Sequence, residues 1–142
     1  MKGNLNEYVL TAGLLLLFMS VVHAVYGETV VFSDLRFLSF DRALFATVYV
    51  PWHQMSLVLF ISSIGLILSS FNKEHRSIQP FVLLVILSNL VIFIIAIING
   101  DDIKGTSRAI LISLAWPQFF FFLVLVLLIG LGIRRERRSG AR

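Results

Sequence analysis

The sequence contains no cysteine, which excludes disulfides, thiolate metal sites, iron–sulfur clusters and the paired thiols of membrane redox enzymes. Charge is also scarce, because Asp, Glu, Lys and Arg make up 14% of the 142 residues while hydrophobic residues make up 58%. Soluble domains carry about 25% charged residues. The shortage of charge therefore predicts an integral membrane protein.

Four long apolar stretches follow one another along the chain. They cover about residues 8–26, 43–70, 79–99 and 109–133. Each reaches the length of about 20 residues that is needed to cross about 30 Å of hydrocarbon. We therefore expect an all-α integral membrane protein, with one domain over residues 1–142 that forms a four-transmembrane-helix bundle. A basic tail, residues 134–142, follows the last helix.

The connection between the first two predicted helices, residues 27–42, mixes apolar residues such as Phe32, Leu35, Phe37, Leu38 and Phe40 with several charged ones. It is too apolar for a free loop, so we expect it to lie in the membrane interface. A cleaved signal peptide remains an alternative for the first apolar stretch, because Val22-His23-Ala24 resembles a small-residue cleavage site. Cleavage would leave three transmembrane helices.

The basic residues are distributed unequally between the two sides of the predicted bundle. Eight of the twelve Lys and Arg lie at the termini and in the loop between the second and third helices, and four lie in the other loops. Short loops rich in Lys and Arg stay inside, so we expect a multi-pass protein of the cytoplasmic membrane with both termini cytoplasmic. The lipid bilayer, and not nucleic acid, is the expected anionic partner. The arginines expected to contact lipid headgroups are Arg134, Arg135, Arg137 and Arg138.

Polar side chains inside hydrocarbon are costly, so their positions are informative. At about 100° per residue, Tyr49 and Ser56 fall on the same face of the second helix as His53. At about 1.5 Å per residue, His53 lies at a similar depth to Asn89 and Gln118. This arrangement predicts a polar pocket in an apolar wall that binds a small apolar ligand. The predicted ligand-binding residues are His23, Tyr49, His53, Ser56, Asn89, Trp116 and Gln118.

A second interpretation assigns these polar residues to hydrogen bonds between helices, with no ligand. The protein would then be a non-catalytic accessory subunit that binds a membrane protein partner or a second copy of itself. We expect His23, near the outer end of its helix, to bond to Ser20 or Tyr26.

Catalysis receives less support from the sequence. No apolar stretch contains a Lys or a central Asp or Glu, which disfavours an ion-coupled pump. A redox enzyme subunit that binds quinone or haem b through His23 and His53 is the alternative, although the two histidines differ in expected depth by roughly 5 to 10 Å. We predict no catalytic residue, no metal site and no bound cofactor outside this alternative.

Overall fold

A computed structural model shows the chain as a set of long helices. It describes residues 5–33, 41–99 and 108–140, with side chains except at 44, 96–97, 99, 108–116 and 139–140. The long helices are α1 (Glu7–Tyr26), α3 (Arg42–Phe71), α4 (Ile78–Asn99) and α5 (Arg108–Gly140). All four contain spans long and apolar enough to cross a membrane. The prediction of an all-α chain with four helices long and apolar enough to span a membrane is confirmed, whereas its insertion into a bilayer and its sidedness stay predictions.

Side-chain caps fix the starts of several elements. The Asn6 side chain accepts a hydrogen bond from the backbone N–H of Val9 and so caps α1. The Asp41 carboxylate does the same for α3, 3.1 Å from the N–H of Ala43. Asn and Asp are favoured at these positions because a helix leaves its first N–H groups without backbone partners. The 3-10 turn η2 (Lys73–His75) is capped by the Asn72 side chain and leads into α4.

Two helices are longer than expected. α1 continues without a break through the π-helix η1 (Gly27–Val31) into Phe32, so residues 27–33 of the predicted interfacial connection are helical. Phe32 is fully buried, and its packing against α3 explains why the helix extends past Tyr26. The rest of the connection, residues 34–40, lies outside the described residues. α5 extends through the arginine-rich stretch to Gly140, because Arg and Glu are good helix formers.

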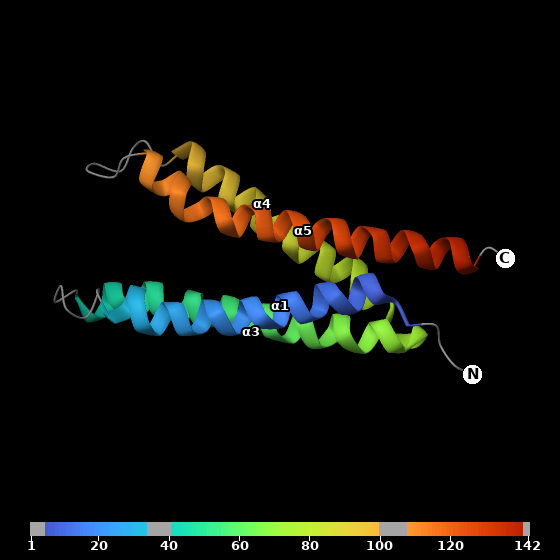
Figure 1. Cartoon of the computed structure of the whole chain (residues 1–142). Coiled ribbons are helices and arrows are strands. Elements are labelled where there is room, and N and C mark those ends of the chain that lie inside the picture. Colours follow the sequence, from blue (N-terminus) through green and yellow to red (C-terminus); the bar gives the residue numbers. More distant parts are fainter. Residues whose placement is uncertain (1–4, 34–40, 100–107, 141–142) are drawn as a thin grey trace.

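The helices are arranged as two pairs. α1 runs beside α3 along its length, and α4 runs beside α5 (Figure 1). The pairs lie close together at the end that carries both chain termini and stand apart at the opposite end (Figure 1). We call these the terminal end and the open end.

Apolar side chains fill the interior and also cover the exterior. The core contains Val9, Ala12, Leu16, Leu59, Leu66, Val82, Ile86, Leu90, Phe122, Leu125 and Ile129. Large apolar side chains on the outer faces, such as Phe18 at 65% and Phe81 at 64% exposed, would form an unusually large apolar surface in water. Hydrocarbon is the solvent that suits such a surface, since helices satisfy their own backbone hydrogen bonds.

Candidate functional site

The open end holds a group of polar and aromatic side chains between α1, η1 and α3. Tyr49, Trp52, His53 and Ser56 are spaced at i, i+3, i+4 and i+7, so all four lie on one face of α3. That face packs against α1 and η1. Single π-helical turns inside α-helices often occur at functional sites, and η1 supplies Glu28 to this group.

Glu28 joins two side chains of α3 through one carboxylate oxygen. The Tyr49 hydroxyl donates to Oε1 of Glu28 at 2.7 Å, and Nε2 of His53 lies 3.0 Å from the same oxygen. The buried ring of Phe32 packs 4.7 Å from the Tyr49 ring and 5.6 Å from the His53 ring, measured between centroids. The Glu28 carboxylate is therefore held at the open end by the phenol of Tyr49 and the imidazole of His53.

His23 belongs to a second set of contacts. Its Nδ1 lies 2.8 Å from Oγ of Ser56, and Ser56 donates its hydroxyl proton to the carbonyl of Trp52 at 3.1 Å. A serine hydroxyl has only one proton, so the bond from Ser56 to the Trp52 carbonyl assigns Nδ1 of His23 as the donor to Ser56. In the neutral imidazole of that tautomer, Nε2 keeps its lone pair. The expected bonds of His23 to Ser20 or Tyr26 were wrong: Ser20 donates to the Leu17 carbonyl instead.

Trp52 and His23 contact each other twice, through a hydrogen bond and through their stacked rings. The indole Nε1 donates to the His23 carbonyl at 3.0 Å, and the two rings are stacked with centroids 4.3 Å apart. This approach requires glycine at position 27, because a Cβ atom on Gly27 would collide with the Trp52 indole. Overpacking of this kind typically costs about 1 to 3 kcal/mol.

A cleft of about 560 Å³ separates this group from α5. We call it the interpair cleft, since α1, η1 and α3 form one wall and α5 forms the other. Its polar side chains are few. The lining residues are Met19, Val22, His23, Tyr26, Val31, Trp52, Pro117, Gln118 and Phe121.

The predicted ligand-binding residues are divided between different places. His23 and Gln118 line the interpair cleft. Tyr49 and His53 contact Glu28, and His53 and Ser56 also line a shallower groove of about 340 Å³ between α1 and α3. Of the two predicted histidines, His23 lines the interpair cleft and His53 lines the groove between α1 and α3.

Asn89 lies away from the cleft, and the prediction for Trp116 stays untested. The Asn89 amide donates to the carbonyl of Val85 in its own helix at 2.9 Å, and Asn89 does not line the interpair cleft. The side chain of Trp116 lies outside the described residues. Within residues 5–33, 41–99 and 108–140, no three His, Asp or Glu side chains converge as metal ligands.

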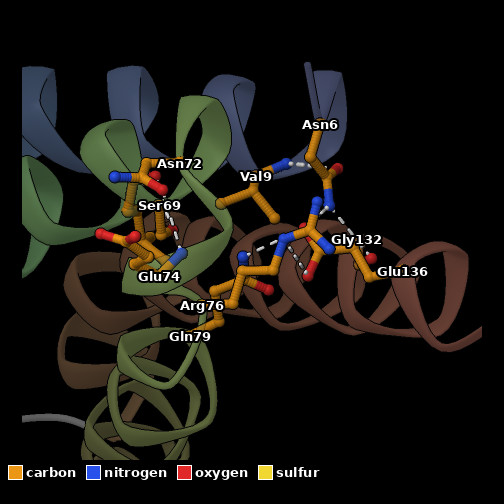
Figure 2. A network of polar contacts seen from close by, with 10 residues as sticks. Asn6, Val9, Ser69, Asn72, Glu74, Arg76, Gln79, Gly132 and Glu136 are labelled. Atoms are coloured by element: carbon orange, nitrogen blue, oxygen red, sulfur yellow. Dashed lines mark hydrogen bonds and ion pairs between the residues drawn. The ribbon is translucent and has the colours of Figure 1, made fainter. Parts of the chain in front are cut away.

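The terminal end contains a polar network that the sequence analysis missed (Figure 2). We call it the polar clasp. It consists of Asn6, Ser70, Arg76, Gln79, Gly132 and Glu136.

Asn6 and Glu136 are the centre of the clasp. The backbone N–H of Asn6 donates to the Ser70 carbonyl at 3.0 Å, and its amide donates to the Gly132 carbonyl at 3.1 Å and to Oε1 of Glu136 at 2.7 Å. Gln79 donates to the same Oε1 at 3.3 Å, and Nε of Arg76 lies 3.2 Å from Oε2. One carboxylate thus joins the start of α1 and the start of α4 to α5.

Burial makes these contacts important for stability. Asn6 and Gln79 are 2% and 1% exposed, and a buried polar group left without its partner costs about 1 to 3 kcal/mol. Glycine at 132 allows α1 to approach, since a Cβ there would collide with Val9. A lone acid among four arginines, Glu136, was the only sequence signal for this network.

No protein-family model, curated protein or solved structure matches this chain.

Proposed function

We propose that the protein binds a small, mainly apolar molecule in the interpair cleft and holds a polar group of that molecule at His23 and Gln118. The cleft itself is the observation that supports this function. Its volume of about 560 Å³ falls within the range of about 300 to 1,000 Å³ that is usual for small-molecule sites. Its walls are mostly aliphatic and aromatic, with few polar groups, which is also usual for such sites.

The hydrogen bonds of His23 indicate the chemistry of the ligand. Since Nδ1 is committed to Ser56, the Nε2 lone pair is the group that a ligand can use. A hydroxyl or N–H group on the ligand would donate to it, while the Gln118 amide both donates and accepts. We infer a ligand with a hydroxyl-type head and an apolar body, which includes a quinol.

Haem b receives less support than a small hydroxyl-bearing ligand. Haem ligation by two histidines would need a ring nitrogen from each of them. Nε2 of His53 lies against Glu28 and Nδ1 of His23 against Ser56. Nε2 of His23 would be available to the iron, but Nε2 of His53 would have to give up its contact with Glu28.

Native mass spectrometry of gently solubilised full-length protein, with an absorption spectrum of the same sample, tests the proposal. Wild type should retain an apolar small molecule. Val22→Phe, which fills the cleft, should reduce retention at least about tenfold. Val25→Phe is the matched control, because Val25 is also on α1 but lines the shallower groove instead.

Each outcome has a defined meaning. A bare wild-type chain, or equal retention by wild type and Val22→Phe, would refute ligand binding in the cleft. Loss of retention in Val25→Phe alone would move the site to the groove between α1 and α3. A Soret band would replace the proposal with the haem alternative.

A further inference from the structure

A second cleft, of about 570 Å³, lies at the terminal end between the start of α1 and the end of α5. We call it the basic cleft. Its α5 side is made by Leu131, Arg134, Arg135 and Arg138, and α1 contributes Tyr8. The α5 residues are spaced at i, i+3, i+4 and i+7, so they share one helix face. Arg137 is absent from this lining although it belongs to the same basic stretch.

The three arginines of the cleft differ in their partners. Nη1 of Arg135 lies 4.0 Å from Oε2 of Glu7, and its guanidinium lies 5.9 Å above the Tyr8 ring. Among the described residues, neither Arg134 nor Arg138 has an ion pair. Two guanidinium groups with unbalanced charge therefore border the same cavity, and an anion would bind between them more favourably than on an isolated arginine.

The position of the cleft along the helices, at the end of their apolar segments, indicates which anion suits it. The apolar part of α5 ends at Ile133, two residues after Leu131, and the apolar part of α1 begins at Tyr8. The cleft thus spans the border between hydrocarbon and headgroups, where arginines gain from anionic lipid. Guanidinium groups match the oxygens of phosphate, and Leu131 and the Tyr8 ring offer apolar contact below them.

We propose that the basic cleft binds the phosphate of one anionic phospholipid, with the headgroup between Arg134 and Arg138 and the first part of an acyl chain against Leu131. This site is separate from the interpair cleft, so either site can exist without the other. The proposal distinguishes a specific lipid site from the general attraction of all four arginines to the membrane surface.

Native mass spectrometry with defined lipids tests the site. Full-length protein is titrated with phosphatidylglycerol and, separately, with phosphatidylcholine of the same acyl chains. Wild type should retain one phosphatidylglycerol more tightly than phosphatidylcholine. The double variant Arg134→Ala/Arg138→Ala should bind phosphatidylglycerol about thirtyfold more weakly, since each arginine near anionic lipid contributes about 1 kcal/mol.

Arg137→Ala is the matched control, because it removes the same charge from the same helix outside the cleft. It should change phosphatidylglycerol affinity by less than about twofold if binding is site-specific. Equal losses in Arg137→Ala and in each of Arg134→Ala and Arg138→Ala would overturn the site in favour of general surface attraction. All three side chains are exposed, and unchanged melting temperatures will show that the variants fold.

Inorganic phosphate distinguishes a lipid from a soluble ligand. At about 10 mM it should displace little phosphatidylglycerol, since it lacks the acyl chain that contacts Leu131. Complete displacement would show that the cleft recognises soluble phosphate and would overturn the lipid assignment. Equal retention of phosphatidylcholine and phosphatidylglycerol by wild type would also overturn it.

Discussion

The two ends of the bundle use polar residues in opposite ways. At the terminal end, Glu136 of α5 accepts from Gln79 of its neighbour α4 and also from Asn6, which precedes α1, so the Asn6 bond crosses between the helix pairs. At the open end, the hydrogen bonds that join Glu28 to Tyr49 and His23 to Ser56 connect α1 and η1 to α3 of the same pair. A hydrogen bond between the pairs therefore accompanies their close approach at the terminal end. Where the hydrogen bonds remain within one pair, a cleft is left beside α5.

The largest effect should come from breaking the clasp. Glu136→Leu removes the acceptor shared by Asn6 and Gln79 and the partner of Arg76. The carboxylate is 13% and the guanidinium 26% exposed, so the loss should be below that of a fully buried pair, at about 2 to 3 kcal/mol. Unfolding of the solubilised protein in SDS, followed by circular dichroism, measures it.

Glu7→Gln is the control for this variant. Glu7 also pairs with an arginine, but its side chain is 75% exposed, and exposed ion pairs contribute about 0 to 1 kcal/mol. Equal destabilisation by Glu7→Gln and Glu136→Leu would mean that the clasp contributes no more than a surface ion pair.

The second effect concerns the open end. Gly27→Ala should destabilise the protein by about 1 to 3 kcal/mol and weaken ligand retention, because the new methyl group displaces the Trp52 indole. Gly130→Ala is the matched control, since a Cβ there meets no atom within 4 Å. The same unfolding assay, with intrinsic tryptophan fluorescence, compares them. Identical behaviour of the two variants would show that Gly27 and Trp52 do not pack closely.

The smallest effect is expected in α4. Asn89→Leu removes an amide that bonds only to a carbonyl of its own helix among the described residues, so stability should change by less than about 0.5 kcal/mol. Ligand retention should remain as in wild type. A loss of ligand retention comparable to that of Val22→Phe would show that Asn89 belongs to the binding site and that the site reaches α4.

The four helices could be predicted because each apolar stretch is long enough to span a bilayer by itself. The site was less predictable. Glu28 was assigned to a connecting segment, and only the π-helix, together with the burial of Phe32, turns it toward His53. Periodicity placed Tyr49, His53 and Ser56 on one face of α3, but it could not identify their partners on α1 and η1.

The clasp could not be predicted for a different reason. Asn6 and Glu136 are separated by 130 positions, and each has a local explanation, one as a helix cap and the other as a charge in a basic stretch. Helical periodicity reports neighbours within one helix, whereas these contacts depend on how separate helices cross. The depth estimate for Asn89 had the same weakness, since equal depth does not make two side chains meet.

The length of α5 has a mechanical consequence. Gln118 lies 14 residues from Gly132, or about 21 Å along the helix axis at about 1.5 Å per residue. If the clasp acts as a pivot, a rotation of about 5° there would move Gln118 by roughly 2 Å, through the lever arm of that helix length. Small changes among the clasp residues would then widen or narrow the distant cleft.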